Sequence, residues 1–169
     1  MKLLEIFKAS NNIRLDKKTL VVLRWIAIIG QFITINFVFF ILNFDFPFFY
    51  CIAVIFFGAV TNFYLQFREK KNLLSDFDST IYLAYDLVQL TVLIFFTGGI
   101  TNPFVLLLVI PAVVSSTFLS LRSTMNLSFI TFIFLLVLTI YHFPLPSSEE
   151  LHFHVPNYYL YGTPVAIII

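Results

Sequence analysis

The stretch of this chain best suited to chemistry is Gly98-Gly99-Ile100-Thr101-Asn102-Pro103-Phe104, which lies between apolar runs at residues 81–96 and 104–114. Two adjacent glycines let a flat molecule approach the backbone closely, so that backbone N–H groups can meet a carbonyl oxygen. The Phe104 ring, with Phe95 and Phe96 nearby, offers a surface for stacking. A planar head with two carbonyl groups and an apolar tail, as in a quinone, fits these features.

The same stretch also has a purely structural explanation. Gly98 and Gly99 can take the left-handed conformation that ends a helix. Asn102 is a favourable N-cap residue, and Pro103 suits the first position of the next helix. From these residues alone, a tight helical hairpin and a ligand site both stay open.

A second group of polar residues is expected inside the membrane. Asp86 lies about 10 Å into its helix, where a charge costs about 2.5–3.5 kcal/mol and normally has a partner. Arg24 and Asn62 fall at a similar depth, and together with Asp86 they form a predicted inner polar layer. Ser115 lies at a similar depth on the fourth predicted helix.

Helical periodicity places more polar residues beside this layer. Arg24, Ala27, Gln31 and Thr34 form one stripe, and Tyr82, Asp86, Gln89 and Leu93 form another. Gln31 and Gln89 are therefore expected to pair across the first and third helices. Such groups can serve helix packing alone or can take part in signalling or ligand binding, and both interpretations stay open.

The helices that carry these polar residues are expected to be membrane helices. Of the 169 residues, 60% are hydrophobic and 11% are charged, and the mean hydropathy is +0.96. A chain this apolar predicts an integral membrane protein. The net charge of +1, without a basic block, gives no support for nucleic-acid binding. The single cysteine, Cys51, excludes an internal disulfide and is interpreted as a small buried hydrophobe.

The predicted fold class is therefore an all-α polytopic bundle of six transmembrane helices. Residues 1–19 form a cytoplasmic N-terminal segment, and residues 20–169 form the membrane domain. The expected helices span residues 20–42, 48–67, 80–97, 103–121, 124–141 and 157–169, with Asp78 or Ser79 as the N-cap of the third. The sixth is incomplete, because a spanning helix needs about 20 residues, so the chain is expected to be truncated within it.

The charges between these helices predict the orientation. Of ten Lys and Arg residues, six precede or open the first helix, three lie between the second and third, and one lies between the fourth and fifth. The positive-inside rule then predicts a cytoplasmic N-terminus and places residues 98–104 at the outer face. His142, His152 and His154 fall in an outer loop, where a metal site is not expected. No catalytic motif is present.

The sequence is similar to the membrane domains of RegB/PrrB (ActS) redox-responsive sensor histidine kinases. Gly98, Gly99, Asn102, Pro103 and Phe104 match the specified positions of that family's Gly-Gly-x-x-Asn-Pro-Phe heptapeptide. Further resemblance lies in Leu23-Arg24-Trp25-Ile26-Ala27, Gly30-Gln31, Tyr85-Asp86-Leu87-Val88-Gln89-Leu90, Pro111 and Leu160-Tyr161-Gly162.

This resemblance implies a bacterial inner-membrane sensor that detects ubiquinone at residues 98–104. Oxidised quinone would lower autophosphorylation by a cytoplasmic kinase domain, and phosphate would pass to a response regulator. The resemblance also implies a homodimer, an ATP-binding kinase domain absent from this chain, and a redox-active cysteine distinct from Cys51. The alternatives are a small polytopic transporter and a quinone-interacting membrane protein without kinase output. The chain has no internal repeat that would indicate a transporter.

Overall fold

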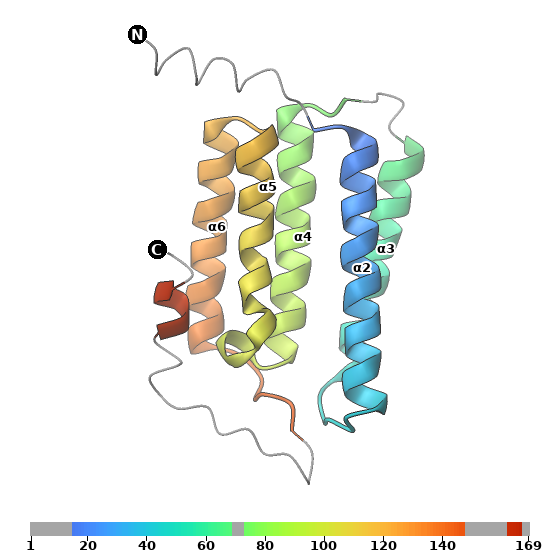
Figure 1. Ribbon diagram of the computed structural model, residues 1–169, viewed down its shortest axis with the longest axis vertical. Coiled ribbons are helices and arrows are strands. Elements are labelled where there is room, and N and C mark those ends of the chain that lie inside the picture. Colours follow the sequence, from blue (N-terminus) through green and yellow to red (C-terminus); the bar gives the residue numbers. More distant parts are fainter. Residues whose placement is uncertain (1–14, 69–72, 148–161, 167–169) are drawn as a thin grey trace.

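The computed structural model describes residues 15–68, 73–147 and 162–166 of the chain. The regular elements of the described residues are helices (Figure 1): α2 (Lys17–Phe40), α3 (Phe48–Arg68), α4 (Asp76–Phe96), the short 3₁₀ helix η2 (Gly99–Thr101), the 3₁₀ helix η3 (Pro103–Val109), α5 (Ile110–Phe118) and α6 (Leu121–Ile140).

Four of these helices, α2, α3, α4 and α6, are long and apolar enough to cross a membrane, and residues 103–118 form a shorter apolar helical segment. The predicted all-α polytopic membrane fold is therefore confirmed. Residues 162–166 are helical, whereas the remainder of the sixth predicted helix, 157–161 and 167–169, lies outside the described residues.

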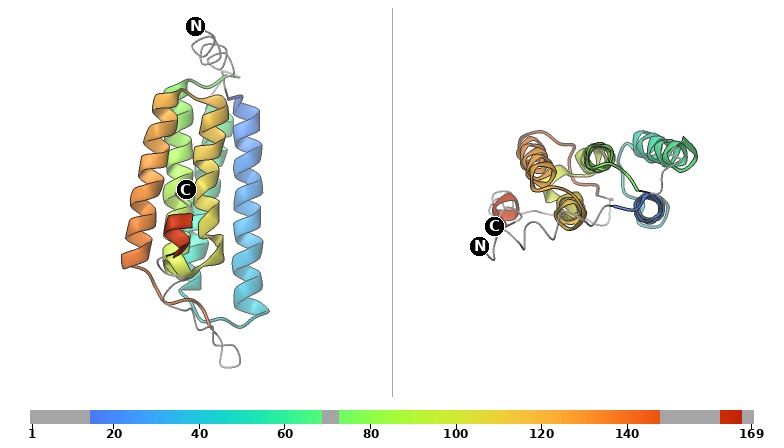
Figure 2. Two further views of the ribbon diagram at one scale, coloured as in Figure 1. Left: turned by 60° about the vertical axis from the view of Figure 1, so that its left-hand side comes forward. Right: turned by 90° about the horizontal axis from the view of Figure 1, so that it is seen from above.

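The helices form two rows when the bundle is seen from above (right view of Figure 2). One row consists of α6, α4 and α3, with α4 in the centre, and the other consists of α5 and α2. Helix α2 packs mainly on α3, and α5 packs on α4, α6 and η3. Helices α2 and α5 therefore lie in the same row, one on either side of the line that faces α4.

Buried apolar side chains hold three parts of the bundle together. One cluster, at one end of the bundle, includes Leu20 of α2, Leu65 of α3 and Leu127 of α6. Ile28 and Ile55 belong to a cluster between α2 and α3 towards the other side. A third cluster, buried between α4, η3 and α6, consists of Leu87, Ile94, Ile100, Val105, Leu108, Leu135 and Leu138.

The start of α4 differs from the prediction. Its N-cap is Ser75 rather than Asp78 or Ser79, and the Ser75 hydroxyl accepts a hydrogen bond from the Asp78 backbone N–H at 3.1 Å. This is the pattern in which a serine is followed three residues later by an acidic residue. The carboxylates of the first turn favour this position because the N-terminal end of a helix is partly positive.

The helix expected at residues 103–121 is interrupted. It begins at Pro103 as predicted, but residues 103–109 are 3₁₀ and α-helical geometry begins only at Ile110. Pro111 has no N–H to donate to the carbonyl of Leu107, and its ring crowds that carbonyl. The Ile110 N–H donates to the Leu107 carbonyl instead, which gives the tighter 3₁₀ turn.

The helix expected at residues 124–141 begins three residues earlier, because residues 121–123 form the first turn of α6. Ser120 is the N-cap, and its hydroxyl accepts from the Ser123 N–H at 3.3 Å. Asp76 at the start of α4 reinforces this cap: its carboxylate accepts from the Ser120 N–H at 2.7 Å and from the Ser123 hydroxyl at 2.5 Å. The two helix starts are thus joined by a contact between residues 44 and 47 positions apart.

Candidate functional site

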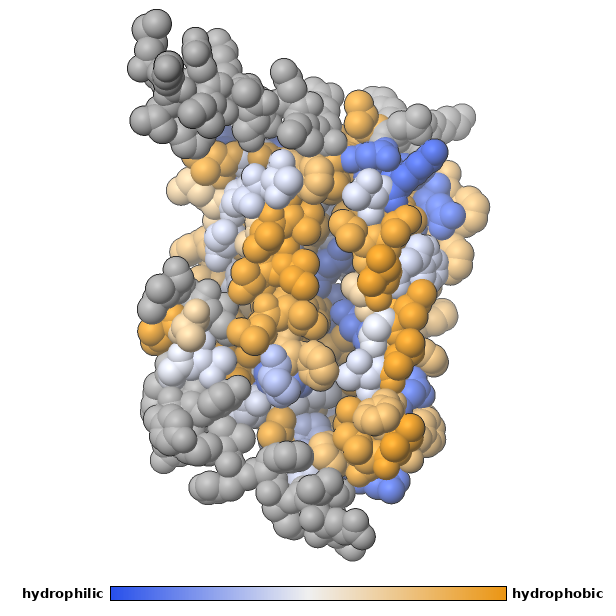
Figure 3. Space-filling view, in the orientation of Figure 1, coloured by the Kyte–Doolittle hydropathy of each residue, from blue (hydrophilic) through white to orange (hydrophobic). Residues whose placement is uncertain are grey.

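A groove of about 1000 Å³ separates α2 from α5, and α4 forms its floor. Its wall begins at Leu20 near the start of α2 and extends to Phe104, Leu145 and Pro146 near the opposite end of the bundle. The space-filling view shows this hollow between two apolar ridges, with hydrophilic residues in its depth (Figure 3). Both groups of residues that the sequence singled out therefore border one cavity.

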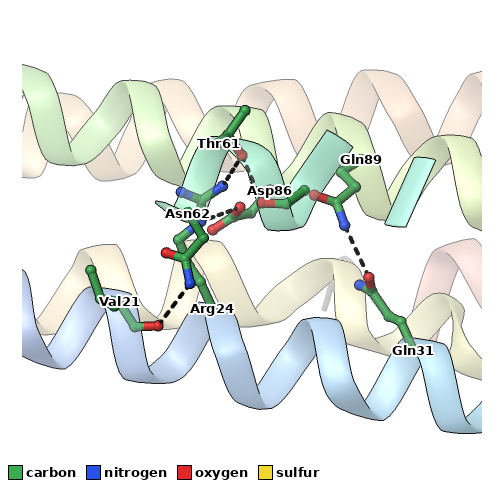
Figure 4. Close-up of polar contacts among 8 residues, drawn as sticks. Val21, Arg24, Gln31, Thr61, Asn62, Asp86 and Gln89 are labelled. Carbon is green, nitrogen blue, oxygen red and sulfur yellow. Dashed lines mark hydrogen bonds and ion pairs between the residues drawn. The ribbon is translucent and has the colours of Figure 1, made fainter. Parts of the chain in front are cut away.

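Arg24 and Asp86 form an ion pair in the part of the groove towards Leu20. Arg24 Nε donates to Asp86 Oδ1 at 2.8 Å, and Arg24 Nη2 donates to the Thr61 hydroxyl at 2.9 Å (Figure 4). The rings of Tyr82 and Tyr85 each lie 5.5 Å from the guanidinium carbon. An ion pair with aromatic neighbours lowers the cost of carrying these charges inside a membrane.

Gln31 and Gln89 also meet across α2 and α4. Gln89 Nε2 donates to Gln31 Oε1 at 3.0 Å, which is the pairing that the two stripes predicted (Figure 4). Of those stripes, Arg24, Ala27, Gln31 and Thr34 all line the groove, as do Asp86, Gln89 and Leu93. The helical periodicity of the sequence thus identified the face of each helix that borders the cavity.

Asn62 and Ser115 contribute to packing at other helix contacts. The Asn62 side chain is fully buried and donates to the Val21 carbonyl at 3.2 Å, so it joins α3 to α2. Ser115 is also buried, but its hydroxyl donates to the Ala112 carbonyl of its own helix at 2.7 Å. Ser115 therefore makes no hydrogen bond to Arg24, Asn62 or Asp86.

The glycines of residues 98–104 form the sharp turn after α4. Gly98 has a φ of 114° and Gly99 a φ of 55°, both in the left-handed region that favours glycine. A Cβ atom on Gly99 would lie 2.3 Å from the His142 side chain, and one on Gly98 would lie 2.6 Å from Leu145. The close approach that these glycines permit is thus made by the chain's own segment after α6.

Asn102 caps η3 as predicted. Its Oδ1 accepts from the Phe104 N–H at 2.9 Å, and its Nδ2 donates to the Thr97 carbonyl at 2.9 Å and to the Thr97 hydroxyl at 2.7 Å. The side chain is buried, with 7% of its surface exposed. The asparagine therefore ties the end of α4 to the start of η3.

Only part of the stretch 98–104 lines the groove. Asn102, Pro103 and Phe104 line it, and 46% of the Phe104 surface is exposed. Gly98 and Gly99 are buried outside its wall. The expected ligand surface on the glycine backbone is thus covered, whereas the apolar end of the heptapeptide is accessible from the groove.

The sequence did not predict three residues that contribute to the site. Leu145 and Pro146 line the groove at its Phe104 end, and Phe143 packs on Phe95 and Phe96 beside the glycine turn. These residues follow α6 and are distant in sequence from the stretch that they cover. No local periodicity could have assigned them to it.

The fold and the groove define this chain as a polytopic α-helical membrane domain with a polar-floored intramembrane cavity. The chain belongs to the PilS-like transmembrane domain family, whose sequence profile matches residues 20–168. It is 33% identical over 153 residues to the sensor histidine kinase RegB of Cereibacter sphaeroides. The matched region covers 90% of this chain and 33% of that relative. The chain therefore spans about a third of the relative's length. No solved structure matches it.

Proposed function

We propose that this chain is the membrane sensor region of a two-component histidine kinase. In this proposal it responds to redox state through the ubiquinone pool at residues 98–104 and controls autophosphorylation and phosphotransfer to a response regulator. Its membership of the PilS-like transmembrane domain family and its similarity to a sensor histidine kinase support the kinase output. ATP would bind a kinase domain outside this chain.

The observation that carries quinone binding is the groove itself. It is wide enough for a drug-sized molecule, and apolar side chains make up most of its wall. Its outer end contains Asn102, Pro103 and Phe104, which are part of the heptapeptide. A long apolar chain with a small oxygen-bearing head suits a cavity whose walls are apolar and whose floor is polar.

The same proposal sets the orientation and the partners. The protein would lie in a bacterial inner membrane with its N-terminus in the cytoplasm, because the Lys and Arg residues alternate between loops. Helix α4 joins residues 98–104 to the cytoplasmic side and carries Asp86 and Gln89 between them. A homodimer and a cognate response regulator complete the proposed pathway.

Ubiquinone binding to the domain in lipid nanodiscs tests the proposal. Phe104→Ala should weaken binding about fivefold or more, because it removes an exposed ring from the groove wall. Leu106→Ala is the matched control: Leu106 lies on the same helix, is 61% exposed, and does not line the groove. Equal binding by wild type and Phe104→Ala would contradict a quinone site at this end of the groove.

A further inference from the structure

The polar groups at the outer end of the groove are already used by the protein. Both ends of the Asn102 amide make hydrogen bonds, to Phe104 and Thr97. The Thr97 hydroxyl donates to the Leu93 carbonyl at 2.8 Å, and the Thr101 hydroxyl donates to the Gly98 carbonyl at 2.6 Å. These groups fix the backbone turn and leave little hydrogen-bonding capacity for a ligand.

The inner end of the groove differs in this respect. Asp86 accepts from Arg24 through Oδ1, and its Oδ2 has no hydrogen-bond partner among the described residues. The Asp86 side chain is 26% exposed, against 2% for Arg24, so the carboxylate is the charged group presented to the groove. An acceptor open to a membrane cavity is costly unless something donates to it.

Gln31 supplies a donor beside this acceptor. Its Oε1 accepts from Gln89, which leaves its Nε2 group free of partners within the described part of the chain. Gln89 lies three residues beyond Asp86, about 4.5 Å along the axis of α4, so the Gln31 amide and the Asp86 carboxylate border the same stretch of groove. Arg24 Nη1 is unpaired at this level, but it is buried and so is not presented to the groove.

We propose that Gln31 and Asp86 hold the head group of an isoprenoid quinone at this inner end, and that its chain runs outward along the apolar wall to Phe104. The proposal rests on the proposed function in taking a quinone as the ligand, and it places the head within the membrane rather than at the glycine turn. Phe104 then contacts the chain of the ligand.

The chemistry of the two side chains favours this ligand over other lipids. The head must be small and uncharged, because a phospholipid head would carry its charges into the hydrocarbon layer. Its oxygens must accept from Gln31 Nε2, which both the quinone and the quinol can do. A hydroxyl must donate to Asp86 Oδ2, which only the quinol can do. The Asp86 contact should therefore be specific to the reduced form.

Trp25 reports the depth of the head group, because it is the single tryptophan of the chain and is adjacent to Arg24. Quinones quench tryptophan emission at short range. A head beside Asp86 lies at the level of Trp25, whereas a head at Thr97 would be 11 residues further along α4, or about 16 Å away. The 169-residue chain in nanodiscs, titrated with a short-chain ubiquinone, should show saturable Trp25 quenching.

Gln31→Leu should shift this titration to about tenfold higher quinone, the loss expected for one buried hydrogen-bond partner. Asn36→Leu is the matched control, because Asn36 is an amide on the same helix whose Nδ2 donates to the Phe32 carbonyl outside the groove. Trp25→Phe combined with Phe56→Trp, at a 64% exposed position of α3, measures collisional quenching by quinone dissolved in lipid. Saturable quenching should be absent in that variant.

The outcomes separate this proposal from the proposed function. Quinone binding that depends on Phe104 but leaves Trp25 emission unchanged would place the head at residues 98–104 and overturn the inner site. Absence of saturable quinone binding by any readout would overturn the proposed function as well. In Asp86→Asn, the affinity for the quinol, measured by its displacement of bound quinone, should fall more than the affinity for the quinone. An equal loss of both affinities would contradict the contact between Asp86 and the quinol.

Discussion

At the scale of single residues, the Arg24–Asp86 pair is the most demanding feature of the domain. Two charges inside a membrane cost least when each is paired with the other and makes further polar contacts. Arg24 is 2% exposed in its side chain and contacts Asp86, Thr61 and two tyrosine rings. The pair therefore fixes α2, α3 and α4 relative to one another at one depth.

Removing one partner should cost more than removing both. Arg24→Met leaves the Asp86 carboxylate unpaired and should lower the free energy of unfolding by about 3 kcal/mol. Arg24→Met combined with Asp86→Leu should recover part of that loss, because no uncompensated charge remains. Unfolding of each variant in mixed detergent micelles measures both values.

Ser116→Ala serves as the control for this cycle. Ser116 is exposed and its hydroxyl bonds the Val113 carbonyl of its own helix, so its removal should change the unfolding free energy by less than about 0.5 kcal/mol. The cycle also needs Asp86→Leu measured alone. A double variant as unstable as the sum of Arg24→Met and Asp86→Leu would show that the ion pair does not couple the helices.

At the scale of the elements, the turn between α4 and η3 is held from a distance. Residues 98–104 reverse the chain, and the segment after α6 then packs on them through His142 and Leu145, while Phe143 packs on Phe95 at the end of α4. The Phe143 N–H donates to the Phe95 carbonyl at 3.0 Å, which satisfies an acceptor at the end of α4. The two adjacent glycines are therefore required by this packing as well as by the turn.

Gly99→Ala should be strongly destabilising, by more than about 2 kcal/mol, because it combines a left-handed φ with a collision against His142. Gly30→Ala is the matched substitution in α2, where a Cβ would meet nothing within 4 Å. It should leave stability unchanged or raise it by up to about 1 kcal/mol. Thermal unfolding in detergent, followed by circular dichroism, measures both.

A Gly99→Ala variant as stable as Gly30→Ala would mean that the segment after α6 does not cover the turn. The glycine surface would then be open to a ligand. Adding His142→Ala to the Gly99→Ala variant would distinguish the causes of a loss. The second substitution should relieve the collision with the new methyl group at position 99 but not the strain of the backbone there.

At the scale of the whole molecule, the two rows of helices create the site. Helix α4 contacts α3, α5 and α6, whereas α2 and α5 flank it without closing on each other. The result is a groove that joins residues near the two membrane faces. Because the charged pair and the heptapeptide border the same cavity, occupation of the groove can affect both the middle of α4 and the turn that follows it.

The alternation of charged loops predicts which ends of the helices face the cytoplasm. In a Cys51→Ser background, a cysteine in place of Ser147 should react with a membrane-impermeant thiol reagent added to intact cells. A cysteine in place of Arg122 should react only after the membrane is permeabilised, since the positive-inside rule places Arg122 in the cytoplasm.

The Cys51→Ser background leaves the introduced cysteine as the single thiol of the chain. Cys51 is fully buried, so it is not expected to react with the reagent itself. The opposite labelling of the two positions would invert the proposed topology. Residues 98–104 would then face the cytoplasm, which would contradict the outer quinone-sensing end.

Local sequence determined much of this protein. Composition and the spacing of apolar runs predicted the membrane helices, because each must satisfy its own backbone within the hydrocarbon layer. Helical periodicity predicted the stripes of α2 and α4 and the contact between Gln31 and Gln89. The N-cap role of Asn102 and the helix-ending role of Gly98 also followed from residue type, because caps depend on neighbouring backbone groups.

Other features depended on contacts between distant residues, and only the tertiary structure decided them. The start of α6 is fixed by Asp76 of α4, the surface of Gly99 is covered by His142, and the groove exists because α2 and α5 stand apart across α4. Periodicity gives the face that a helix buries but not the neighbour that it meets. For this reason the sequence indicated two separate polar sites, and the packing of the helices joined them in one cavity.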